Sequence, residues 1–177
     1  DMRRGGCTAT FVGIESGNNE MLKKIKKTQT TDECVQAMQN LRKHGIESHA
    51  FIMVGFPDET EETFKQTMDF IPQLKPDGVI FSIFTPYPGS DIYNECKNKG
   101  IIQDDFDLAL YNHQSPLNCF TKNIPKERFY ELRKKALKVN APENIIDTCG
   151  TGGVGIKIFN VSTTCLLYTS PSPRDQR

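Results

Sequence analysis

Three short stretches place ligand-binding groups directly after apolar runs of the sequence. Glu15 and Ser16 follow the first run, Gly55 follows the second, and Tyr87 stands just beyond the third. A carboxylate and a hydroxyl can hydrogen-bond to sugar hydroxyls. A glycine admits a ligand close to the backbone, and a tyrosine ring can stack on a flat heterocycle. Each stretch is therefore a candidate contact with a small molecule.

A purely structural interpretation stays open for each of these groups. Ser16 or Asn18 could cap a helix, and Asp58 with Glu61 could cap another. Tyr87 lies between two prolines, where an aromatic ring often serves packing alone.

A fourth stretch is rich in glycine and lies far along the chain. Residues 150–155 read Gly-Thr-Gly-Gly-Val-Gly. Backbone N–H groups without side-chain hindrance form a suitable cradle for phosphate oxygens. Asn160, Ser162 and Thr163 add side-chain donors shortly afterwards. The alternative for such a stretch is a flexible linker.

The cysteines do not form a local metal-binding motif. No two of them are closer than 16 positions, so neither CxxC nor CxxxC occurs. We expect free thiols, as in cytosolic proteins. The six positions are Cys7, Cys34, Cys96, Cys119, Cys149 and Cys165.

Strand-like and helix-like runs alternate over residues 1–118. The apolar runs 8–14, 48–54 and 78–84 are typical of buried strands. Between and after them we expect a helix over about 31–44, introduced by the capping box of Thr30 and Glu33, a second helix beginning near Asp58, and a third from Ser90 to Gly100. Phe129, Leu132 and Ala136 indicate a further helix in residues 119–140. The fold class is therefore α/β, with parallel strands and crossover helices.

Composition and charge exclude several classes of protein. The chain has 177 residues, with 22 basic and 22 acidic side chains. It therefore lacks the excess of positive charge that is typical of nucleic-acid-binding proteins. No apolar run approaches the roughly 18 residues of a membrane span, and the N-terminus does not resemble a secretory signal. We expect a cytoplasmic protein.

The strand-helix portion resembles the second half of a radical S-adenosylmethionine (SAM) core, close to the subgroup that often carries a cobalamin-binding domain. The likeness runs to about residue 135 and rests on residues 12–18 (VGIESGN), 49–63 (HAFIMVGFPDETEET) and 81–93 (FSIFTPYPGSDIY). It implies a partial TIM-type barrel containing the fourth to sixth strands. Glu15 and Ser16 would face the ribose of SAM. The adenine and methionine moieties would lie beside Gly55, Phe84, Thr85, Pro86 and Tyr87.

One departure from that family bears on catalysis. The family holds a 4Fe–4S cluster on a CxxxCxxC motif, and this sequence has none. Because the cluster supplies the electron that cleaves SAM, we expect an enzyme as the parent but an inactive chain. The substrate of the parent is not evident from the sequence. A non-enzymatic α/β binding module is a further alternative.

Residues 136–164 resemble a different family, anthranilate phosphoribosyltransferase, and we expect residues 141–164 to form a separate glycine-rich fragment of that type. There a GTGGDG loop and an N-x-S-T segment bind phosphoribosyl pyrophosphate with magnesium. Val154 replaces the aspartate of that loop, which puts the metal in doubt. The alternative function that this resemblance implies is that of a partial enzyme of tryptophan biosynthesis. The residues that would contact pyrophosphate are Gly150, Thr151, Gly152, Gly153, Asn160, Ser162 and Thr163.

The last segment, 165–177, fits neither family. Codons for Cys165 to Asp175 can be written so that they reproduce an adapter of transposase-based sequencing libraries. We expect this tail to be translated adapter without regular structure, and the junction near 133–138 to be a misjoined read, with a natural fusion as the alternative. A cut barrel would leave the first strand with an open edge. It would also leave part of the stripe Cys34, Met38 and Leu41 in contact with water.

Overall fold

The computed structural model describes residues 1–103, 105–107, 109, 111, 115 and 117–139. Three strands, β1 (Ala9–Glu15), β2 (Glu47–Val54) and β3 (Gly78–Ile83), form a parallel sheet in the order β1-β2-β3. The predicted α/β class and the parallel sheet are confirmed. The helices are α1 (Asn19–Lys24), α2 (Thr31–Lys43), α3 (Glu61–Leu74), α4 (Asp91–Asn98) and α5 (Lys126–Val139).

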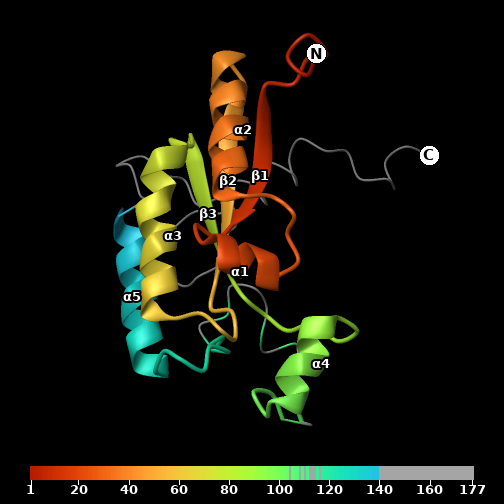
Figure 1. The fold of residues 1–177 in the computed structure, drawn as a ribbon, viewed down its shortest axis with the longest axis vertical. Helices are drawn as coiled ribbons and strands as arrows, with labels where there is room; N and C mark the ends of the chain where they lie inside the picture. Colours follow the sequence, from red (N-terminus) through yellow and green to blue (C-terminus); the bar gives the residue numbers. More distant parts are fainter. Residues whose placement is uncertain (104, 108, 110, 112–114, 116, 140–177) are drawn as a thin grey trace, which may run out of the picture. The chain divides into compact units, whose positions relative to one another are not determined.

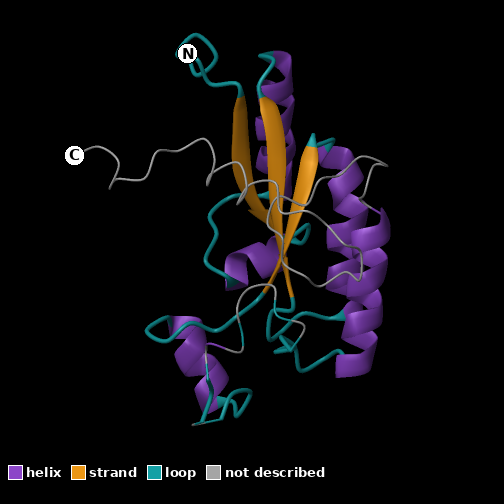
Figure 2. Cartoon of the chain, turned by 180° about the vertical axis from the view of Figure 1, so that it is seen from behind, coloured by secondary structure: helices purple, strands orange, loops and turns teal. Residues whose placement is uncertain are grey.

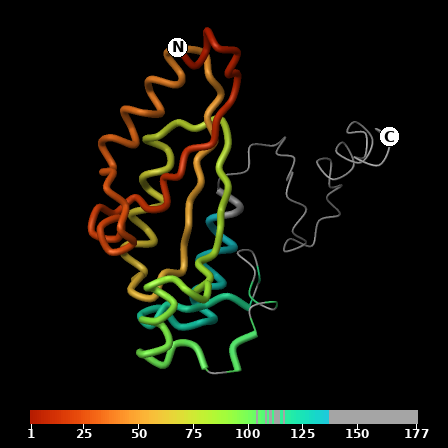
Figure 3. Tube along the Cα trace, turned by 90° about the vertical axis from the view of Figure 1, so that its right-hand side faces the viewer, coloured from red at the N-terminus to blue at the C-terminus, as the bar shows by residue number. Residues whose placement is uncertain are grey.

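Helices α2 and α3 cover one face of the sheet, as Figures 1 and 3 show. The alternation of side chains in β2 explains this arrangement, since successive residues of a strand point to opposite faces. Ser48, Ala50, Ile52 and Val54 are all buried, whereas the residues between them are more exposed. Ala50 pairs with Val12 of β1 on the same face, which extends the apolar layer across the strands. Figure 2 shows the sheet from its other face.

The helix starts agree with the predicted caps except at α3. Thr30 and Glu33 form the expected capping box of α2, and the side chain of Ser90 accepts from the Tyr93 N–H at α4. Helix α3 is capped by Thr60, which exchanges hydrogen bonds with Thr63. The prediction that Asp58 caps this helix is therefore wrong, because Asp58 lies in a turn, closed by the Glu59 N–H donating to the Phe56 carbonyl at 3.0 Å, that precedes the helix.

The expected exposure of the α2 stripe is wrong for Cys34 and Met38 and holds only for Leu41, which is partly buried. Cys34 is 4% exposed and Met38 is fully buried, while Leu41 packs against the same core. Burial is possible because α2 packs on β2 and α3, both of which the chain contains. The first strand, in contrast, pairs only with β2 among the described residues. Phe11 on β1 is 59% exposed.

Helix α5 has the predicted stripe and belongs to the main core. Phe129 and Ala136 are buried with the apolar residues of α3 and the sheet, and Leu132 packs against them. The rings of Phe129 and Phe64 meet edge to face, 6.3 Å apart. Residues 1–139 form one compact unit. The expected segments 141–164 and 165–177 lie outside the described residues. Within the described residues, no helix is long and apolar enough to cross a membrane.

Candidate functional site

The carboxyl ends of the three strands lie side by side at one edge of the sheet. Glu15 at the end of β1 pairs with Ile52 near the end of β2. The Phe84 N–H, just after β3, donates to the Val54 carbonyl at 2.8 Å. The fold therefore brings Glu15, Gly55 and Phe84 to the same edge, where ligands of open parallel sheets bind.

Glu15 is held in an unusual conformation with its carboxylate beside a lysine. Its φ is 65°, and the strand register shifts between Gly13 and Glu15. Glu15 Oε1 lies 3.0 Å from Lys27 Nζ, and the two side chains are 16% and 40% exposed. A Cβ at Gly13 would lie 2.9 Å from the same oxygen, so this glycine makes room for the carboxylate. The arrangement presents a fixed carboxylate, largely screened from solvent, with an adjacent cation.

Ser16 is turned toward α3 rather than toward solvent. Its side chain is buried, and its hydroxyl lies 3.2 Å from Thr67 Oγ1. The Gly17 N–H donates to the same Thr67 oxygen at 3.1 Å. A Cβ on Gly17 would lie 2.6 Å from Phe70 Cβ, so only glycine lets this turn approach α3. Ser16 and Thr67 thus anchor the turn that follows Glu15.

Gly55 is required by the packing of the protein itself. Its φ is +87°, a region that favours glycine. A Cβ at this position would lie 2.9 Å from Phe129 Cζ, so the space expected for an approaching ligand is occupied by that ring on the side of the Cβ. The backbone of Gly55 stays at the strand end.

Glu59 carries a buried carboxyl in the turn after β2. It is 1% exposed and accepts a hydrogen bond from the Gly55 N–H. Burial raises its pKa to about 7, although the Gly55 hydrogen bond acts in the opposite direction. Sequence reasoning missed both Glu59 and Lys27. An acidic residue inside a loop gives no local sign of burial, and Lys27 is one of several lysines in its segment.

Residues 84–87 are mostly covered by a later segment of the chain. Phe84, Thr85 and Pro86 are buried. Asn118 Nδ2 donates to Thr85 Oγ1 at 2.6 Å, and the Phe120 ring meets Phe84 edge to face at 6.0 Å. Tyr87, in contrast, is 48% exposed. Of these four predicted contacts, only Tyr87 offers its side chain at the surface.

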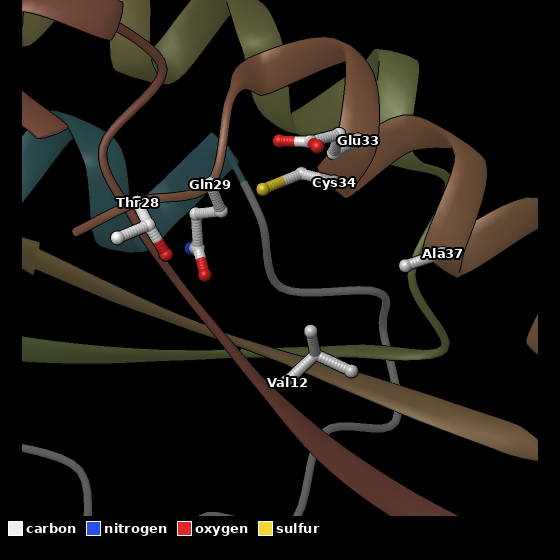
Figure 4. A pocket seen from close by; sticks show the side chains of 6 residues that line it. All are labelled: Val12, Thr28, Gln29, Glu33, Cys34 and Ala37. Carbon is white, nitrogen blue, oxygen red and sulfur yellow. The ribbon is translucent and has the colours of Figure 1, made fainter.

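A hollow in the described structure lies beside β1. It is lined by Val12 of β1, by Thr28 and Gln29 of the α1–α2 connection, and by α2, as Figure 4 shows. Val12 belongs to the face that packs against the core. The hollow thus lies on the helix side of β1 and does not include Glu15. Its α2 lining consists of Glu33, Cys34 and Ala37.

The described residues do not fit an iron–sulfur cluster. Cys7, Cys34, Cys96 and Cys119 are free thiols on separate parts of the fold. Burial raises the pKa of Cys34, Cys96 and Cys119, which disfavours the thiolate that binds metal. In the same part of the chain, no three His, Cys, Asp or Glu side chains gather to hold a metal ion.

The parallel α/β unit and the polar groups at its strand ends fit a known superfamily of proteins. Residues 1–71 match the Radical SAM superfamily. The fold is also similar to a solved structure of Elp3 from the archaeon Methanocaldococcus infernus, with a TM-score of 0.51 and 27% identity. That similarity covers 55% of this chain and 24% of the other. The N-terminal part of the chain is therefore of radical SAM type, and the structure is consistent with part of a TIM-type barrel.

Curated relatives point to the same superfamily. The chain is 35% identical over 141 residues to bacteriochlorophyllide d C-12(1)-methyltransferase of Chlorobaculum tepidum. This similarity covers 78% of this chain and 30% of the relative. It is 30% identical over 115 residues to anaerobic magnesium-protoporphyrin IX monomethyl ester cyclase of Rubrivivax gelatinosus, covering 65% of this chain and 20% of that protein. The chain thus spans less than a third of the length of these relatives.

Proposed function

We propose that this chain is part of a radical SAM enzyme and contributes one wall of its SAM site. The observation that carries the proposal is the Glu15–Lys27 pair, fixed at the carboxyl end of β1 within the segment that matches the superfamily. Residues 1–118 would supply the fourth to sixth strands of the core barrel, and residues 119–140 a helical extension.

The proposed contacts differ in what they contribute. Glu15 would accept hydrogen bonds from the ribose hydroxyls, because its carboxylate is held in place and retains 16% exposure. Tyr87 would stack on the adenine ring. The buried groups would shape the edge rather than touch ligand through their side chains. These are Ser16, Gly55, Phe84, Thr85 and Pro86.

Reductive chemistry would require residues outside this chain. The 4Fe–4S cluster supplies the electron in this superfamily, and we propose that its ligands belong to another part of the parent enzyme. The chain alone would then bind SAM without cleaving it. A cobalamin domain in the parent is a prediction of the resemblance, as is a small-molecule substrate.

The direct test is SAM binding by the full chain. Equilibrium dialysis with radiolabelled SAM should show binding that unlabelled SAM displaces and that unlabelled ATP displaces less well. Anaerobic incubation with iron, sulfide and dithionite should yield neither a stoichiometric 4Fe–4S cluster nor 5′-deoxyadenosine. Absence of SAM binding would refute the proposed site. Formation of 5′-deoxyadenosine would refute the proposed inactivity.

The origin of the C-terminal part is a separate proposal. We infer that residues 141–164 are a phosphoribosyltransferase-like fragment and that residues 165–177 derive from a sequencing adapter. Support comes from the sequence motifs alone, since these residues lie outside the described structure. Remapping raw reads of the source DNA across codons 130–165 tests the junction. Reads that cross it uniformly and continue into a coding region would contradict the adapter origin.

A further inference from the structure

The turn that follows β2 encloses a carboxyl group that has no role in the proposed contacts. Glu59 is 1% exposed, and its side chain accepts the Gly55 N–H. Among the described residues, no lysine or arginine lies within ion-pair distance of this carboxyl. A carboxylate placed there has lost its water and gained no counter-ion, which disfavours its charged form.

A later segment of the chain covers this turn. Thr121 Oγ1 donates to the Glu59 carbonyl at 2.8 Å, and the Asn123 side-chain amide donates to the same oxygen at 3.3 Å. The Lys122 N–H donates to the Pro57 carbonyl at 3.0 Å. These polar contacts are partly exposed, whereas Phe120 and Ile124 of the same segment are buried, so an opening confined to the turn would break the polar contacts and leave those two side chains in place.

We propose that Glu59 is a protonation-dependent latch, which keeps the turn Gly55–Thr60 closed while its carboxyl is neutral and releases the turn when the carboxyl ionises. The physical basis is linkage: a state in which the carboxyl reaches water is favoured as the carboxyl loses its proton. Because Gly55 lies at the proposed ligand edge, release would alter the SAM site. That consequence, but not the latch itself, rests on the proposed function.

Burial is the cause of the shifted pKa, and neighbouring charges do not account for it. The pKa of Glu59 rises from 4.5 to about 7, and burial is the effect that raises it. The charged groups on the elements around the turn are engaged elsewhere. They are Asp58 with Lys24 and Lys99, Lys122 against the Lys99 carbonyl, and Glu61 with Arg128. Burial also raises the pKa of Cys119 and so disfavours its thiolate form.

Amide hydrogen exchange of the full chain tests the latch. In the wild type, protection of the Gly55 amide, corrected for the intrinsic exchange rate, should fall on the order of a hundredfold between pH 5 and pH 8. The Ile52 amide, in the buried centre of β2, reports opening of the sheet itself, and its protection should stay above that of Gly55 at every pH. Glu59→Gln should abolish the pH dependence at Gly55, whereas Glu62→Gln, on the exposed first turn of α3, should retain it.

Each outcome is decisive. Gly55 protection that equals Ile52 protection, or that does not fall across this range, would overturn the latch, and these wild-type measurements decide even where Glu59→Gln fails to fold. A fall in Gly55 protection that Glu59→Gln leaves unchanged would also overturn it. Loss of SAM binding at every pH, with a normal Gly55 response, would refute the proposed function and leave the latch in place.

Discussion

The ring of Phe129 on α5 fills the space beside Gly55 at the end of β2, so that a Cβ there would lie 2.9 Å from Cζ of the ring. Gly55 also adopts a φ of +87°. These two constraints act on the same position, one through backbone conformation and one through packing. They couple the end of β2 to helix α5, which lies much later in the chain.

Substitution Gly55→Ala should destabilise the protein by about 2–4 kcal/mol, because the left-handed backbone and the contact with Phe129 both oppose a methyl group. Urea denaturation measures the change. Gly100→Ala is the matched control: its φ is +64° but nothing lies within 4 Å of the added methyl group, so only the backbone cost of about 1 kcal/mol applies. Equal losses for the two variants would show that Phe129 does not restrict Gly55.

Replacing the buried carboxyl should change how stability depends on pH. A pKa raised from 4.5 to about 7 means that the folded protein holds a proton that the unfolded chain has released. Stability must then fall as pH rises through this interval, by up to about 3 kcal/mol. The wild type should therefore lose stability relative to Glu59→Gln between pH 5 and pH 8 in urea titrations. A difference between the two that stays constant with pH would contradict the assignment.

The pair at the end of β1 should contribute to ligand binding. Glu15→Gln should weaken SAM binding about tenfold, because an amide oxygen accepts hydrogen bonds from hydroxyl groups less strongly than a carboxylate. Glu20→Gln, in the fully solvated pair with Lys23, is the control and should bind like the wild type. Equilibrium dialysis gives both affinities. Unchanged binding by Glu15→Gln would remove Glu15 from the site.

The open edge of β1 should promote self-association. Phe11 is 59% exposed on this strand, and β1 pairs only with β2 among the described residues. Edge strands with exposed apolar side chains pair with other chains. We expect the full chain to form oligomers in light scattering, and Phe11→Glu to increase the monomer fraction. Leu117→Glu, at a similarly exposed site outside the sheet, should have little effect. A monomeric wild type would refute this expectation.

The sequence by itself determined the three strands, four of the five described helices and their order, whereas α1 was foreseen only as the alternative in which Ser16 or Asn18 caps a helix. Short continuous apolar runs predicted three strands, and the caps at Thr30 and Ser90 set two helix starts, because both signals depend on neighbours within a few positions. Glu15 and Ser16 after the first strand and Tyr87 after the third indicated the carboxyl edge of the sheet as the candidate site. The start of α3 was misplaced because Asp58 and Thr60 are both acceptable caps by local criteria.

Only the tertiary structure decided what the side chains at that edge do. Glu15 meets Lys27, Ser16 turns to Thr67 and Gly55 meets Phe129. The same holds for Glu59, whose burial follows from the cover supplied by residues 118–123. Such contacts join residues far apart in the sequence, and they are set by strand register and helix packing rather than by local pattern. The neutral carboxyl of Glu59 is the clearest case, since its pKa depends on burial that no short segment of the sequence encodes.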